Sequence, residues 1–131
     1  MTLLSRDAIL AADDIPQETV DVPEWGGQVL VRGLTGTQRD AFEGEMAERN
    51  GKKLSMNIRN IRARLVSRTL IDEDGDLLFG PADVDALGEK SAAALDRVFD
   101  VALRLSGMSP DDVEEMAANF PEGQNDSSTS V

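Results

Sequence analysis

Apolar residues recur at helical spacing through residues 91–107, which is the best-defined helix pattern in the chain. The stripe occupies positions i, i+3, i+4, i+7 and i+8, formed by Leu95, Val98, Phe99, Ala102 and Leu103. Ser91 can accept a backbone N–H at the first turn, and Gly107 can adopt the left-handed conformation that ends the last turn. Val101 and Leu105 extend the stripe toward a second face. We therefore expect a helix with partners on two sides, the second being a helix of the same chain or another subunit.

Four shorter helices are predicted from the same spacing together with start and stop signals. They cover residues 4–12, 35–49, 56–70 and 82–87. Thr35 and Gln38 have the spacing of a capping box, and Ser55 can cap the helix that follows it. We interpret the Asn50–Gly51 pair as the end of the second of these helices. A further helix is expected after Ser109, where a proline and two acidic residues suit a first turn.

Alternating apolar and polar residues predict two strands, at 19–25 and 28–32. They flank Gly26–Gly27, a pair that suits a tight two-residue turn. Because an isolated hairpin is only marginally stable, we favour Trp25 as a cover for the apolar face where the hairpin packs on the core over Trp25 as a platform for a ligand. A second, shorter hairpin is expected over residues 71–79.

The acidic run in this second hairpin also allows a calcium-loop interpretation. An EF-hand loop that began at Asp72 would need glycine at its position 6 and glutamate at its position 12. Here glycine stands at position 4, leucine at position 6, and Asp83 at position 12. We therefore favour a plain turn at Asp74–Gly75 over a calcium site.

Together these elements predict a mainly α fold of the α+β class. It has about five helices, a small N-terminal β-hairpin at 19–32 and, as a weaker feature, a second short hairpin. The length of 131 residues fits one domain, which we place at 1–120. Residues 122–131 contain a single apolar side chain, so we expect a disordered acidic tail over 121–131.

The composition excludes most catalytic chemistry. The chain has no cysteine, histidine or tyrosine, which removes disulfides, thiolate nucleophiles, imidazole bases and the commonest zinc ligands. It has no phosphate-binding GxxxxGK[ST] loop and no apolar run near the roughly 18 residues of a membrane span. We therefore expect a cytoplasmic protein that is not an enzyme, with no cofactor, no metal, no catalytic residue and no membrane partner.

Charge is unevenly distributed along the chain, whose formal net charge is −12. Residues 1–31 carry −5, residues 32–68 carry +5, and residues 69–131 carry −12. The basic middle can attract another copy of the chain or a charged protein, whereas the overall charge repels nucleic acid. The simpler interpretation is that these charges only solvate helix faces on a monomer.

The charge pattern nominates two faces for a head-to-tail contact between copies of the chain. The basic face lies on the predicted helix at 56–70 and carries Arg59, Arg62, Arg64 and Arg68. The acidic face lies on the helix after Ser109 and carries Asp111, Asp112, Glu114 and Glu115. Because surface ion pairs are individually weak, Val101 and Leu105 are the apolar residues expected to supply most of the affinity.

Three ordered stretches of the sequence carry a family resemblance. They are Val22-Pro-Glu-Trp-Gly-Gly27 with Val31-Arg-Gly-Leu-Thr-Gly36, Arg62-Ala-Arg-Leu-Val66 with Asp72-Glu-Asp-Gly75, and Leu87-Gly-Glu-Lys-Ser-Ala-Ala-Ala-Leu95 with Phe99-Asp-Val-Ala102. In order and spacing they resemble the tail assembly chaperones of long, non-contractile-tailed bacteriophages. The resemblance covers roughly residues 18–118 and contains no motif that encodes chemistry.

The resemblance implies a phage tail assembly chaperone that binds the tape-measure protein and helps recruit tail-tube subunits. It also implies a protein of the host cytoplasm that is absent from the mature virion, and it is compatible with a homo-oligomer. Two other classes stay open. One is an acidic phage protein that mimics DNA and occupies a host nucleic-acid-binding protein, and the other is a minor structural virion component such as a connector or tail-end subunit.

Overall fold

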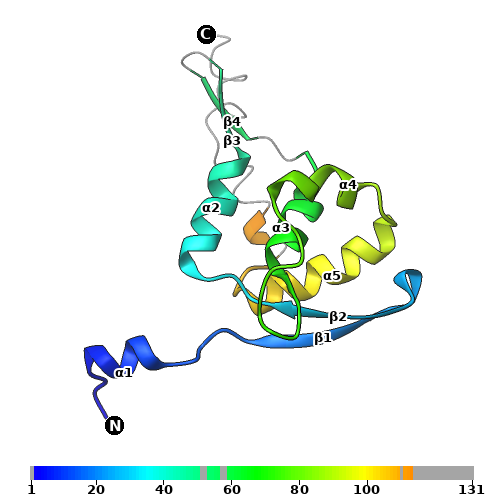
Figure 1. Cartoon of the computed structure of the whole chain (residues 1–131). Coiled ribbons are helices and arrows are strands. Elements are labelled where there is room, and N and C mark those ends of the chain that lie inside the picture. Colours follow the sequence, from blue (N-terminus) through cyan, green and yellow to red (C-terminus); the bar gives the residue numbers. More distant parts are fainter. Residues whose placement is uncertain (1, 51–52, 57–58, 110, 114–131) are drawn as a thin grey trace.

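The computed structural model describes residues 2–50, 53–56, 59–109 and 111–113 of the chain (Figure 1). The elements in chain order are α1 (Arg6–Ala11), β1 (Gln17–Val22), the 3-10 turn η1 (Pro23–Trp25), β2 (Gly27–Arg32), α2 (Gly36–Met46), β3 (Ala47–Asn50), β4 (Lys53–Met56), α3 (Ile61–Thr69), β5 (Leu70–Ile71), η2 (Pro81–Asp83), α4 (Val84–Gly88) and α5 (Ala92–Leu105). The described part of the chain therefore has five α-helices and a three-stranded antiparallel sheet, which confirms the predicted α+β class.

The three-stranded sheet has the order β1–β2–β5. β1 and β2 form the predicted N-terminal hairpin, with Val20 opposite Val29. Alternate residues of a strand face the same side, and Val20, Val22 and Val31 are buried on the inner face. The sheet thus presents one apolar face for the helices.

The second short hairpin is also present. Ile71 pairs with Leu77 in a single antiparallel bridge. The Asp72 carboxylate closes the turn between them, because its Oδ1 accepts a hydrogen bond from the backbone N–H of Asp74 at 2.8 Å. Gly75 has a φ of +90°, the left-handed conformation that a turn at Asp74–Gly75 requires.

The helices cover one face of the sheet. α5 lies along the β1–β2 hairpin, α3 packs against α5, and α2 and α4 flank α3 (Figure 1). The ends of α5 match the prediction, since Ser91 Oγ accepts a hydrogen bond from Ala94 N at 3.2 Å and Gly107 has a φ of +74°. Leu95, Val98, Ala102 and Leu103 of this helix are buried in the core as predicted, whereas Phe99 is half-buried at its edge.

The region between α2 and α3 differs from the prediction. α2 ends at Met46, and the next residues pair as the two-stranded β3–β4 hairpin, with Asn50 opposite Lys53. Ser55 therefore lies in a strand and not at a helix start. α3 begins at Ile61, five residues later than predicted. The Asn50–Gly51 pair, which we interpreted as a helix stop, is also the strongest short-range signal for a hairpin.

The turn of the N-terminal hairpin is longer than the predicted two residues. Pro23, Glu24 and Trp25 form one turn of 3-10 helix, and Gly26 follows at a φ of +79°. Proline suits the first position of such a turn because its ring fixes φ near the value that the turn requires. It also lacks the backbone N–H that would be left unpaired there. Trp25 packs against the core, as expected for a residue that covers the hairpin face.

Two elements extend away from the helices and the sheet in Figure 1. α1 lies beyond the N-terminal end of β1, and the β3–β4 hairpin lies beyond the C-terminal end of α2. α1 falls within the predicted 4–12, and Ser5 caps it by accepting a hydrogen bond from Ala8 N at 3.1 Å. The tail at 121–131 lies outside the described residues, and the domain boundaries at 1 and 120 remain a prediction.

Candidate partner-binding surfaces

Two arginines of the predicted basic face are ion-paired within the chain. Arg62 on α3 pairs with Asp96 on α5, and its guanidinium also lies over the ring of Phe99, 5.8 Å from the centroid. Arg68 pairs with Glu45 of α2. α3 itself carries no acidic residue, and the acidic partners come from α2 and α5. Their charge joins α3 to its neighbours.

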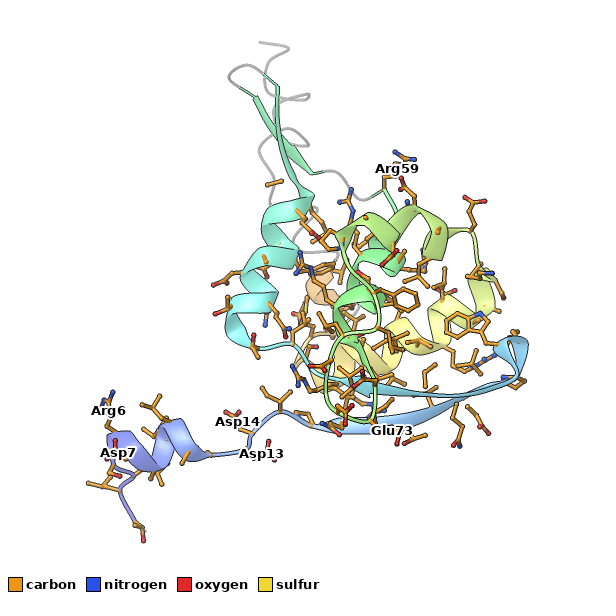
Figure 2. All side chains as sticks on the ribbon, in the orientation of Figure 1. Arg6, Asp7, Asp13, Asp14, Arg59 and Glu73 are labelled. Carbon is orange, nitrogen blue, oxygen red and sulfur yellow. The ribbon has the colours of Figure 1, made fainter. Side chains whose placement is uncertain are left out.

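The other two arginines of this face lie toward the start of α3. Arg59 is exposed and precedes the helix, on the side of the molecule remote from the β1–β2 hairpin (Figure 2). Arg64 is half-buried, and its Nη1 donates a hydrogen bond of 3.4 Å to the backbone oxygen of Glu45. The four arginines therefore do not form one uniform basic face.

The predicted acidic face is described only at its first two residues. Asp111 is exposed. Asp112 is half-buried and closes a capping box, since its Oδ2 accepts a hydrogen bond from Ser109 N at 2.8 Å and its own N–H donates to Ser109 Oγ at 3.2 Å. The expected helix start is thus confirmed at residues 111–113, while Glu114 and Glu115 lie outside the described residues.

Val101 and Leu105, the apolar residues expected to contribute to a contact between copies, lie in the C-terminal half of α5. Both are half-buried and pack against the core of their own chain. The last turn of α5 lies very close to the sheet, since a Cβ on Gly33 would stand 2.3 Å from the backbone oxygen of Leu105. This close approach covers part of the second apolar face of the helix.

Two further ion pairs hold α5 on the hairpin. Arg97 forms two hydrogen bonds to the Glu24 carboxylate, at 2.7 and 2.9 Å, and Arg104 forms two to Glu18, at 3.0 and 2.8 Å. The hydrogen bonds from Arg97 and from the backbone N–H of Glu24 itself lower the pKa of the Glu24 carboxyl from its ordinary 4.5 to about 2. Acidic residues near the N-terminus are thus paired with arginines of the acidic C-terminal segment.

A pocket that the sequence did not predict opens beside the hairpin turn. The Trp25 pocket has a volume of about 460 Å³ and is lined by Glu24, Trp25, Phe79, Asp83, Ala86, Leu87 and Lys90. Its walls come from η1, the loop after β5, and the η2–α4 segment, so only the tertiary fold brings them together. Trp25 Nε1 is buried and has no hydrogen-bond partner among the residues that the structure describes, at a cost of about 1–3 kcal/mol for such a donor. The lone tryptophan was the one sequence signal for this site.

α1 is a second surface that sequence analysis missed. Its flanks and body expose four large apolar side chains: Leu3, Leu4, Ile9 and Leu10. Leu4 and Ile9 stand at the two positions of a hydrophobic staple around the Ser5 cap, a signal that was visible in the sequence. No residue of α1 is buried.

The described residues contain no cluster of three or more acidic side chains that could hold a metal ion. Among the same residues, no helix is both long enough and apolar enough to cross a membrane.

Comparisons with known proteins identify a family and a solved structure to which the chain is similar. A family model described as phage tail assembly chaperone matches residues 5–118. The solved structure of the bacteriophage HK97 tail assembly chaperone is similar, with a TM-score of 0.53 at 21% identity, over 76% of this chain and 94% of that one. No curated protein matches the chain. Since the family model spans most of the 131 residues, the chain belongs to the phage tail assembly chaperone family.

Proposed function

We propose that the protein holds the tape-measure protein and helps recruit tail-tube subunits during tail assembly. The observation that carries this proposal is the family match over residues 5–118. A chaperone of this kind covers apolar surface of its client by contact alone, so the proposal involves no catalysis and no cofactor. It places the protein in the host cytoplasm and not in the finished particle.

The charges of the fold support a chaperone over a DNA mimic. A DNA mimic needs acidic side chains that face solvent together, as phosphates do. Here Glu18, Glu24, Glu45 and Asp96 are each paired with an arginine. These four carboxylates therefore stabilise contacts within the chain and do not face solvent as an unpaired acidic surface.

We also propose that several copies act together on one tape-measure protein. The charged contact nominated from the sequence would join Arg59 and its neighbours on one copy to Asp111 and its neighbours on the next. Because Arg62 and Arg68 already pair within the chain, this contact is expected to contribute modestly. Apolar contact must supply most of the affinity.

Co-expression tests the chaperone role. A tagged chain and the tape-measure protein of the same phage are produced together in bacterial cells, and the soluble fraction is purified on the tag. We expect the tape-measure protein to become soluble and to co-purify with the chain. The control is Leu103→Asp, which places a charge in the core and should abolish the effect.

Two outcomes would contradict the proposal. Tape-measure protein that is equally soluble with and without the chain, and that does not co-purify, would refute the chaperone role. Peptides of this chain recovered at stoichiometric levels from purified particles by mass spectrometry would instead identify a structural virion component.

A further inference from the structure

The apolar side chains of α1 have no cover within the described chain. The exposed fractions are 88% for Leu3, 70% for Leu4, 56% for Ile9 and 68% for Leu10. Figure 2 shows the side chains of α1, with Arg6 and Asp7 labelled, in open space away from the rest of the protein. A six-residue helix is far below the length that is stable alone in water, so an apolar partner surface is needed to hold it.

The Trp25 pocket is a surface of the opposite kind. Its apolar walls are Trp25, Phe79, Ala86 and Leu87, and its volume of about 460 Å³ lies within the range of ligand-binding pockets. Lys90 also lines it, is exposed, and makes no ion pair with any residue that the structure describes. The pocket therefore suits an apolar segment that carries acidic residues beside it.

The segment at residues 2–14 has that chemistry. The apolar helix α1 is followed directly by Asp13 and Asp14, which Figure 2 labels on the linker between α1 and β1. These carboxylates can pair with Lys90 when the helix lies in the pocket. At the other end of the segment, Arg6 can pair with Asp83.

Geometry favours the pocket of another copy. α1 precedes β1 and the pocket follows it, so the two lie at opposite ends of a six-residue strand whose five residue steps span about 17 Å. The linker from Ala12 to Gln17 spans at most about 18 Å when fully extended. Docking in its own chain would require this linker to reverse direction and run back along the strand, whereas α1 extends away from the sheet in Figure 1.

We propose that α1 of one copy docks in the Trp25 pocket of a second copy. Such a contact is head-to-tail, because the donor and acceptor surfaces differ, and it therefore closes a ring or extends an array. The inference rests on the self-association part of the proposed function and does not need the tape-measure protein. It supplies an apolar contact in addition to the one expected of Val101 and Leu105.

Trp25 is the single tryptophan of the chain, so the fluorescence of the chain reports directly on the pocket. The full-length variant Leu4→Asp with Ile9→Asp keeps the pocket but loses the donor helix, and a synthetic peptide of residues 2–14 is titrated into it. We expect a saturable blue shift of Trp25 emission. A peptide with the same two substitutions should bind at least about tenfold more weakly. Equal responses to both peptides, or no response to either, would overturn the proposal.

Sedimentation velocity tests the same contact in the full-length chain. Ala86→Arg fills the pocket from an exposed position on α4 and should shift the chain to the monomer. Ala82→Arg is the matched control, since Ala82 is exposed on the adjacent η2 turn outside the pocket lining, and it should sediment like the unmodified chain. Assembly that survives Ala86→Arg would overturn the proposal.

Two further outcomes distinguish docking between copies from docking within one chain and from the chaperone role. The first outcome is a chain that is monomeric and whose Trp25 emission differs from that of the variant Leu4→Asp with Ile9→Asp at every protein concentration. This result would show that α1 docks within its own chain and would refute the contact between copies. A chain that binds the peptide but fails to solubilise the tape-measure protein would leave the docking contact intact and refute the chaperone role instead.

Discussion

Gly33 lies directly against Leu105: a Cβ at position 33 would stand 2.3 Å from the backbone oxygen of Leu105. The neighbouring residues are joined as well, because Leu34 N donates a hydrogen bond of 2.9 Å to Ser106 Oγ. The end of β2 and the end of α5 are thus fitted together through backbone atoms. Neither backbone can yield as a flexible side chain would.

Gly33→Ala should therefore destabilise the fold. The added methyl group must push α5 from the sheet, and overpacking of this kind costs about 1–3 kcal/mol. The loss of stability is measured as the change in unfolding free energy, obtained from urea denaturation. Gly44→Ala is the matched control, because Gly44 lies inside α2 with nothing within 4 Å of its added Cβ, and alanine there should stabilise the helix by about 0.5–1 kcal/mol. Equal stability of the two variants would show that the close approach is absent in solution.

Leu103→Ala should cost more stability than Phe99→Ala. Leu103 is only 1% exposed, and truncation of a buried leucine costs about 2–5 kcal/mol. Phe99 is half-buried at the edge of the core under Arg62, so we expect about 2 kcal/mol, roughly half the cost of a fully buried phenylalanine. Thermal unfolding of both variants checks the order, and the reverse order would mean that the apolar stripe of α5 is rotated from its position here.

The helix α5 shows how far sequence alone can go. Its cap, its stop and its apolar stripe all lie within 17 consecutive residues, and the structure confirms each of them. The start of α3 was wrong by five residues. Asn50–Gly51 ends helices and also turns hairpins, and nothing local decides between the two uses.

The candidate surfaces were harder to predict, because they depend on distant partners. In the sequence, Arg62 and Arg68 have no acidic neighbour and therefore predict an unpaired basic face. The fold places Asp96 and Glu45 of other helices beside them. The Trp25 pocket likewise joins residues that are more than 50 positions apart, such as Trp25 and Leu87. By contrast, the exposed staple residues Leu4 and Ile9 belong to one short segment, and their spacing could have been recognised.

Arg97→Gln should raise the pKa of Glu24 from about 2 toward its ordinary 4.5, because the two hydrogen bonds from the guanidinium are lost. Carboxyl chemical shifts followed by NMR against pH measure this directly. The lowered pKa in the folded chain means that the stabilisation from this pair is complete above pH 4.5 and is lost as pH falls toward 2. The pH dependence of stability over that window should therefore be shallower in Arg97→Gln, and an unchanged Glu24 titration would show that the pair is open in solution.

The proposed charged contact between copies is best tested at Arg59 and Asp111, since both side chains are exposed. A surface ion pair contributes about 1 kcal/mol or less, so Arg59→Glu should weaken self-association by roughly fivefold at low salt and by less at high salt. The double variant Arg59→Glu with Asp111→Lys restores opposite charges across every head-to-tail contact and should recover the lost affinity. Sedimentation velocity over a range of protein and salt concentrations measures both effects. If the unmodified chain stays monomeric under all conditions, self-association is refuted. If the unmodified chain, Arg59→Glu and the double variant all assemble equally well, the charged contact has no role in assembly.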